Sequence, residues 1–182
     1  MKQGEIQVTL ESLAKSDWDA FILANQVSFN FGALEELGER HTFFEEEGQV
    51  IARETVLMSL EHGQAYWIVL ENQRVGGLVL VLDGEQGELE TLFTSPEVHG
   101  RGIGFATWQV VEATFPQVKV WQTITPYYDQ RNIHFYVNRC GFRIVEYFNA
   151  FHKVMFLEGK EEQDMLEQFP QGVFRFEKRI KK

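Results

Sequence analysis

The sequence has little of three residue types that define particular classes of protein: cysteine, proline and the basic residues. Cys140 is the one cysteine in 182 residues, so the chain can form no intrachain disulfide and has no cysteine pair for a structural zinc site. It has four prolines and no Pro/Ser/Gly-rich tract that is typical of a linker. We therefore expect one continuous domain.

Basic residues are outnumbered, since 17 Lys and Arg stand against 27 Asp and Glu, for a formal net charge of -10. Nonspecific binding to nucleic acid needs clustered Lys and Arg that displace counterions from phosphates, so we expect no nucleic-acid partner. The sequence also lacks an apolar run long enough to span a bilayer and an N-terminal signal core. We expect no membrane partner and a cytoplasmic location.

The periodic segments predict a protein that alternates helices with strands. Helices are expected after Ser16 or Asp17, and over residues 46–60, 102–114, 129–139 and 160–169. Strands are expected over residues 6–10, 65–70, 75–82, 87–94, 118–124, 142–148 and 173–180. Residues 29–44 show no clear period.

A glycine-punctuated loop, His99 to Gly104, lies between a predicted strand and a predicted helix. Glycines at positions 100, 102 and 104 remove side chains, so backbone N–H groups can converge on phosphate oxygens. The N-terminus of the following helix adds the positive end of its dipole. The loop therefore predicts a cradle for a diphosphate.

Two common nucleotide-binding loops do not fit this pattern. A Walker A loop needs Lys and then Ser or Thr after its last glycine, where this chain has Phe105 and Ala106. A dinucleotide fingerprint needs Gly or Ala three residues after Gly102, which is the position of Phe105. The diphosphate therefore belongs to another kind of ligand.

The loop resembles motif A of the GNAT superfamily of N-acetyltransferases, whose pattern is Gln/Arg-x-x-Gly-x-Gly/Ala. His99 stands where the family has Gln or Arg, and Gly102 and Gly104 stand at its two glycine positions. A second segment, residues 132–142, resembles the family's Asn, Phe-Tyr and Gly-Phe segment through Asn132, Phe135-Tyr136 and Gly141-Phe142.

The resemblance implies one GNAT-like acetyltransferase domain over residues 1–182, of the α/β class (α+β by some schemes). Its central sheet would be mixed and mostly antiparallel, with about seven strands, flanked by helices and splayed between the fourth and fifth strands. Residues 12–62 would lie on the acceptor side, residues 84–148 would form the cofactor-binding core, and residues 150–182 would form a long connection and the last strand.

The implied reaction transfers an acetyl group from acetyl-coenzyme A to a primary amine of a small molecule or peptide, by direct attack in a ternary complex and without a metal. An alkyl amine, with a pKa near ~10.4, must lose a proton before it attacks. Glu88 and Glu90 are the candidate bases, and strand alternation predicts that they share one face with Leu92. Tyr136 matches the family position that protonates or hydrogen-bonds the leaving sulfur.

The resemblance also implies which residues contact the cofactor. Main-chain groups of the strand end and the turn after it would pair with the pantetheine arm, the glycine loop would hold the diphosphate, and the later helix would add polar contacts. The implied set is Phe93, Thr94, Val98, His99, Gly100, Arg101, Gly102, Ile103, Gly104, Phe105, Asn132 and Tyr136.

Each assignment has a structural alternative. Glu88 and Glu90 would then be solvated strand-edge carboxylates, and Tyr136 a half-buried aromatic side chain of an amphipathic helix. The carboxylates of residues 35–47 either attract a cationic amine or form a solvated helix face. Residues 153–171 either cover the site or form a homodimer contact. The alternative function is a catalytically silent coenzyme A-binding or regulatory module.

Overall fold

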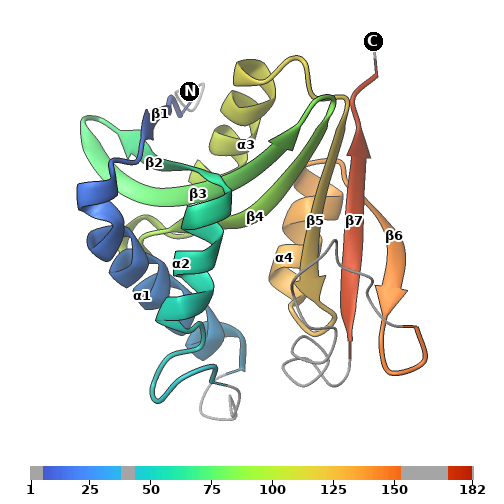
Figure 1. The fold of residues 1–182 in the computed structure, drawn as a ribbon, viewed down its shortest axis with the longest axis horizontal. Helices are drawn as coiled ribbons and strands as arrows, with labels where there is room; N and C mark the ends of the chain where they lie inside the picture. Colours follow the sequence, from blue (N-terminus) through green and yellow to red (C-terminus); the bar gives the residue numbers. More distant parts are fainter. Residues whose placement is uncertain (1–5, 38–43, 153–171, 182) are drawn as a thin grey trace, which may run out of the picture. The chain divides into compact units, whose positions relative to one another are not determined.

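The computed structural model describes residues 6–37, 44–152 and 172–181. The chain divides into two compact units, Met1–Lys119 and Val120–Lys182. Each unit combines part of the β-structure with its own helices (Figure 1).

The first unit contains four antiparallel strands in the order β1-β2-β3-β4. They are β1 (Thr9–Ser12), β2 (Gln64–Leu70), β3 (Gln73–Asp83) and β4 (Gln86–Thr94). Glu71 and Asn72, which join β2 to β3, have φ values of 50° and 63°. Positive φ at both central residues is what a two-residue type I′ hairpin requires. The strands predicted over residues 65–70, 75–82 and 87–94 are confirmed, and they pair in sequence as antiparallel neighbours.

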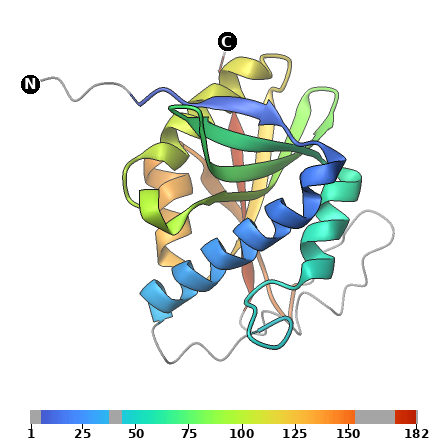
Figure 2. The same ribbon diagram turned by 90° about the vertical axis from the view of Figure 1, so that its left-hand side faces the viewer.

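Helices α1 (Trp18–Leu37) and α2 (Arg53–His62) cover one face of this sheet, and α3 (Ile103–Thr114) lies on the opposite face (Figure 2). The ring of Phe21 on α1 lies 5.1 Å from the ring of Trp67 and 5.1 Å from the ring of Phe93. All three side chains belong to one buried cluster with Val79 of β3. This packing fixes α1 against β2, β3 and β4.

Gly77 of β3 permits the close approach of α1. A Cβ atom at this position would lie 2.3 Å from Cε2 of Phe21 and 2.8 Å from two ring atoms of Phe93. Because these distances are shorter than van der Waals contact, any larger residue would push the helix or the phenylalanine rings away.

The first two helices differ from the predicted ones. The helix expected over residues 46–60 begins only at Arg53, because the preceding turn caps it: Oε2 of Glu45 accepts hydrogen bonds from Ala52 N–H (2.7 Å) and the Thr55 hydroxyl (2.6 Å). Helix α1 extends to Leu37, through residues that show no clear period. Its apolar period is obscured because Asn25 and Gln26 are buried whereas three apolar residues are exposed, namely Leu23, Val27 and Leu34.

The second unit contains β5 (Val120–Pro126), β6 (Arg143–Phe148) and β7 (Val173–Arg179) in the antiparallel order β5-β7-β6. Its helix begins as α4 (Gln130–His134) and continues as a five-residue π-helix, η4 (Phe135–Arg139). Asp129 caps α4 by accepting the Asn132 N–H, and Gly141, with φ of 80°, follows the end of η4. The helix predicted over residues 129–139 is therefore confirmed, although its last five residues are π-helical.

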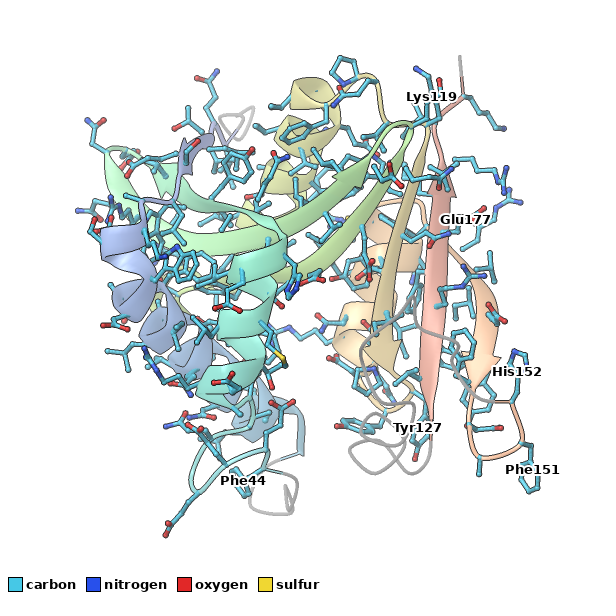
Figure 3. The ribbon with its side chains drawn as sticks, viewed as in Figure 1. Phe44, Lys119, Tyr127, Phe151, His152 and Glu177 are labelled. Carbon is cyan, nitrogen blue, oxygen red and sulfur yellow. The ribbon has the colours of Figure 1, made fainter. Side chains whose placement is uncertain are left out.

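His152 has a structural role in the segment after β6. Its Nε2 lies 2.8 Å from Oε1 of Glu146, whose other oxygen pairs with Arg175 of β7 at 2.6 Å. The hydrogen bond to His152 and the charge of Arg175 lower the pKa of the Glu146 carboxyl. Figure 3 shows His152 and Phe151 beyond the end of β6.

The predicted α/β class, with seven mostly antiparallel strands flanked by helices, is confirmed. The strand expected over residues 6–10 begins later, at Thr9. The single domain and the splay between the fourth and fifth strands stay predictions. The helix expected over residues 160–169 and the dimer contact over 153–171 lie outside the described residues. Within the described ranges, no helix is long and apolar enough to cross a membrane.

The contact at Gly77 predicts that adding one methyl group destabilises the fold. Gly77→Ala should lower the free energy of unfolding by about 1–3 kcal/mol, the usual cost of overpacking a core. Gly32→Ala is the matched control, because Gly32 lies in α1 with no atom within 4 Å of an added Cβ. It should raise stability by about 0.5–1 kcal/mol. Urea denaturation of both variants measures this, and equal stabilities would contradict the packing.

Candidate functional site

Strand β4 contains a β-bulge at Glu90. Thr91 pairs with Val79 of β3 and Leu89 pairs with the next residue, Leu80, so Glu90 has no partner on β3. A bulge bends the strand, changes the direction of its side chains and is frequent beside active sites. Glu90, a candidate base, is therefore the irregular residue of an otherwise regular strand.

The bulge makes one sequence expectation wrong. Glu88 pairs with Val81 and Leu92 pairs with Leu78, and residues that pair directly point to the same face. Val81 and Leu78 are three residues apart on β3, so they point to opposite faces. Glu88 and Leu92 therefore do not share a face, because the one extra residue reverses the alternation.

The two candidate carboxylates lie in different surroundings. Glu88 is exposed, whereas Glu90 is half-buried. Oε2 of Glu90 is shielded from solvent and has no hydrogen-bond partner among the described residues. A shielded, unpaired carboxylate oxygen is unfavourable in the folded state unless a ligand or a proton meets it. Glu90 is therefore the stronger candidate for a base.

The chain leaves the sheet immediately after β4. Ser95 N–H donates to the Val75 carbonyl at 2.8 Å, and the 3-10 turn η3 (Pro96–Val98) follows. Val98 N–H donates to the Ser95 carbonyl at 3.1 Å. That N–H is thus used within the turn, and the contact of Val98 with the pantetheine arm stays a prediction.

The glycine loop has the backbone that its sequence predicts. Gly100 and Gly102 have φ values of 74° and 83°, in the left-handed region that favours glycine. Gly104, by contrast, is the second residue of α3 and has no positive φ. Arg101, between the two left-handed positions, is exposed.

The loop ends at the N-terminus of α3, which carries no cap of its own. Gly102 is the N-cap residue, and Ala106 N–H donates to its carbonyl at 3.1 Å. Ile103 and Gly104 have no carbonyl four residues earlier within the helix. Among the described residues, no side chain caps α3 and its first turn holds no acidic residue. This end of the helix can therefore receive an anion.

Helix α1 contacts the first residue of the loop. The ring of His99 lies 5.6 Å from the ring of Phe31, and its Nε2 lies 4.0 Å from Oε2 of Glu35. These contacts hold the ring of His99 against α1. Glu90, the end of β4 and the glycine loop follow one another along the chain. Within the first unit, α1 contacts this stretch at Thr91 and at His99.

Tyr136 belongs to the second unit, where it is buried in η4 with 7% of its surface exposed. Its ring lies 5.6 Å from the ring of Phe142 and 5.5 Å from that of Phe176. Burial raises the pKa of Tyr136 far above its ordinary value, although its hydroxyl forms a hydrogen bond with Thr123 of β5. The phenol therefore stays protonated at neutral pH. Tyr136 is more deeply buried than the half-buried aromatic residue of the structural alternative, and its role at the leaving sulfur stays a prediction.

Asn132 is exposed in the first turn of α4. Its N–H donates to Oδ1 of Asp129 at 2.9 Å, and its Nδ2 donates to Oδ2 of the same carboxylate at 2.6 Å. The side chain thus has a structural partner, and its contact with the cofactor stays a prediction. The placement of Asn132 and Tyr136 against the glycine loop, which belongs to the first unit, likewise stays a prediction.

The acidic residues near α2 have structural roles. Glu45 caps α2, and the two oxygens of Glu46 accept hydrogen bonds from Gln26 Nε2 at 3.0 Å and Arg53 N–H at 3.2 Å. Attraction of a cationic amine by the carboxylates of residues 35–47 stays a prediction. Among the described residues, no group of three His, Cys, Asp or Glu could hold a metal ion.

Two polar residues of α1 were missed by sequence reasoning, Asn25 and Ser28. Both have a buried oxygen without a hydrogen-bond partner among the described residues. A signal was present for Asn25, which lies four residues after Phe21 and so falls on the apolar face predicted for this helix. A polar residue on a buried face needs a partner.

The chain is similar to proteins of one family in sequence. Residues 18–142 match the family model of the acetyltransferase (GNAT) family. The YrkN protein of Bacillus subtilis (strain 168) is 34% identical over 186 residues, which cover 99% of this chain and 97% of YrkN.

Solved structures of acetyltransferases share the fold. An acetyltransferase from Thermus thermophilus has a TM-score of 0.65 and 17% identity, over 96% of this chain and 98% of that one. The ribosomal-protein-S18-alanine N-acetyltransferase from Escherichia coli has a TM-score of 0.65 and 13% identity, over 97% and 96%. Spermidine N-acetyltransferase from Vibrio cholerae, in complex with CoA and spermine, has a TM-score of 0.62 and 14% identity, over 95% of both chains.

The family model covers more than half of the chain. The chain therefore belongs to the GNAT acetyltransferase family.

Proposed function

We propose that this chain transfers an acetyl group from acetyl-coenzyme A to a primary amine of a small molecule or peptide. The observation that carries the proposal is the shielded, unpaired carboxylate oxygen of Glu90 in the β4 bulge, a few residues before the glycine loop. Two structural neighbours support an amine acceptor, since one is a ribosomal-protein-S18-alanine N-acetyltransferase and the other a spermidine N-acetyltransferase.

The cosubstrate would lie along the first unit. Backbone N–H groups of Gly100 to Gly104 and the N-terminus of α3 would bind the diphosphate, because this end is uncapped and the loop carries no side chain at its glycine positions. The pantetheine arm would follow the main chain of Phe93, Thr94 and Val98 back toward β4. A structural neighbour from Bacillus subtilis was crystallised with CoA, which supports this choice of cosubstrate.

The proposed reaction is a direct displacement. The carboxylate of Glu90 accepts a proton from the bound ammonium group, directly or through one water, and the neutral nitrogen attacks the thioester carbonyl carbon. The C–N bond forms, the nitrogen of the tetrahedral intermediate loses its second proton to water, the C–S bond breaks and the thiolate of coenzyme A leaves. Tyr136 donates its phenolic proton to that sulfur, and solvent then returns a proton to Tyr136. Glu90 then releases its proton to solvent.

Glu90→Gln tests the base. It keeps the shape of the side chain but removes its basicity, so kcat/KM for the amine at pH 7 should fall about 10²–10⁴-fold. The rate that remains should rise with pH as free amine accumulates. Glu88→Gln is the matched comparison on the same strand and should change kcat/KM by less than about threefold. A large loss in Glu88→Gln alone would assign the base to Glu88.

Tyr136→Phe tests the acid and separates an enzyme from a silent coenzyme A-binding module. Loss of the phenol should lower kcat about 10²-fold or more, with little change in the affinity for acetyl-coenzyme A. Tyr66→Phe, which removes a phenol bonded to Gln64 at 3.1 Å, is the control and should retain turnover. Tight cofactor binding by the wild-type protein without release of coenzyme A across a panel of amines would favour the silent module.

Gly102→Ala tests the cradle. Alanine at a φ of 83° is strained and should shift the loop N–H groups, so the Kd for acetyl-coenzyme A should rise about tenfold or more. Gly84→Ala is the matched control, because Gly84 also has a positive φ of 57° and lies in the β3–β4 turn. Calorimetry should show that both variants lose stability but only Gly102→Ala loses affinity. Equal affinities would contradict the assignment of the diphosphate site.

A further inference from the structure

Two buried side-chain oxygens of helix α1 have no hydrogen-bond partner among the described residues. Asn25 is fully buried, with 0% of its surface exposed, and its Oδ1 has no hydrogen-bond partner among the described residues. The Ser28 hydroxyl oxygen is shielded in the same way. Unpaired buried polar groups are few in folded proteins and each has a free-energy cost, so both call for an explanation.

Other polar residues of the same helix show that the chain can satisfy its structural amides. Gln26 Nε2 donates to Oε1 of Glu46 at 3.0 Å and to the Ile51 carbonyl at 3.1 Å. Asn30 Oδ1 accepts the Val50 N–H at 2.9 Å. The unpaired oxygens of Asn25 and Ser28 are therefore exceptions among the polar side chains of this helix.

Asn25 lies beside the residues assigned to the chemistry. Asn25 and Ser28 are three residues apart, so they lie on the same side of α1. Asn25 Nδ2 donates to the Thr91 hydroxyl at 3.3 Å, and Thr91 follows Glu90 directly in β4. Two turns further along the helix, Phe31 contacts His99 at the start of the glycine loop. This part of α1 thus runs from the bulge to the cofactor loop.

The three unpaired oxygens share one chemical property, since each can accept a hydrogen bond. The amide oxygen of Asn25 and an ionised Glu90 carboxylate can only accept, and the Ser28 hydroxyl can accept as well as donate. A primary alkylammonium group offers three N–H donors and no acceptor. An alcohol offers one donor, and an aromatic amine offers two without the charge.

We propose that Asn25 and Ser28 are positioning residues that bind the acceptor's ammonium group beside Glu90, so that the acceptor class is primary alkylamines. This inference rests on the proposed function, because it takes Glu90 to be the base. The amide oxygen and the hydroxyl hold the nitrogen while Glu90 removes its proton, and the freed lone pair then faces the thioester.

The Ser28→Ala variant gives the sharpest test. Removing a buried hydroxyl that makes no hydrogen bond should leave the melting temperature unchanged or raise it. If the hydroxyl binds the acceptor, the KM for spermidine or tyramine should nevertheless rise about 3- to 10-fold, with the KM for acetyl-coenzyme A unchanged. A variant with unaltered KM for both amines would overturn the role of Ser28.

Asn25→Leu removes the amide oxygen at similar volume and should raise the amine KM about 10- to 100-fold, again without a change in the KM for acetyl-coenzyme A. Asn25→Asp retains an oxygen acceptor and should bind the amines at least as tightly as the wild-type protein. Gln26→Leu is the matched control, because its amide is bonded within the chain, and it should lower the melting temperature without this selective effect. Equal effects of Asn25→Leu and Gln26→Leu on the amine KM would show a structural role.

Calorimetric titration of spermidine and tyramine, in the presence of coenzyme A and with aniline and ethanol for comparison, separates this inference from the proposed function. Binding of the two alkylamines that weakens in Asn25→Leu supports the inference, even if the wild-type protein transfers no acetyl group and the proposed function fails. Acetyl transfer to alkylamines with binding unchanged in Asn25→Leu and Ser28→Ala supports the function and overturns the inference. Equal binding of aniline or ethanol would also overturn it.

Discussion

The one extra residue in β4 is the constraint on which the rest of the site depends. Because Glu90 has no partner on β3, the strand pairs regularly on both sides of it while its side chains change face. The residues after the bulge therefore meet α1 through Thr91 and Phe93, and the strand leads into the glycine loop. A strand without the bulge would turn these side chains to the opposite face.

Helix α1 lies beside this bulge and contributes side chains to the proposed site. Its apolar end is held by the Phe21, Trp67 and Phe93 rings, which Gly77 allows to pack closely. Its middle contacts β4 through polar residues, and its later turns contact His99. The apolar packing supplies the stability that allows two polar oxygens to remain unpaired in the folded protein. The apolar period of α1 is thus irregular because the helix packs on the core and also borders the proposed site.

Much of the fold could be predicted from the sequence because its signals are local. The β2–β3 hairpin, the glycines at positions 100 and 102, and the cap at Asp129 each depend on neighbouring residues in the chain. The bulge at Glu90 and the caps from Glu45 and Glu46 could not be predicted, because they depend on pairing with distant residues. The π-helical turn that carries Tyr136 could not be predicted either, because its sequence pattern is that of an ordinary amphipathic helix.

We propose that acetyl-coenzyme A binds along β4 and the glycine loop with its thioester beside Glu90, and a crystal structure of the protein with acetyl-coenzyme A bound would show this arrangement. We expect diphosphate oxygens within hydrogen-bond distance of the backbone N–H groups of residues 100–104, and the thioester carbonyl beside Glu90. A diphosphate bound elsewhere, or a thioester remote from Glu90, would contradict it.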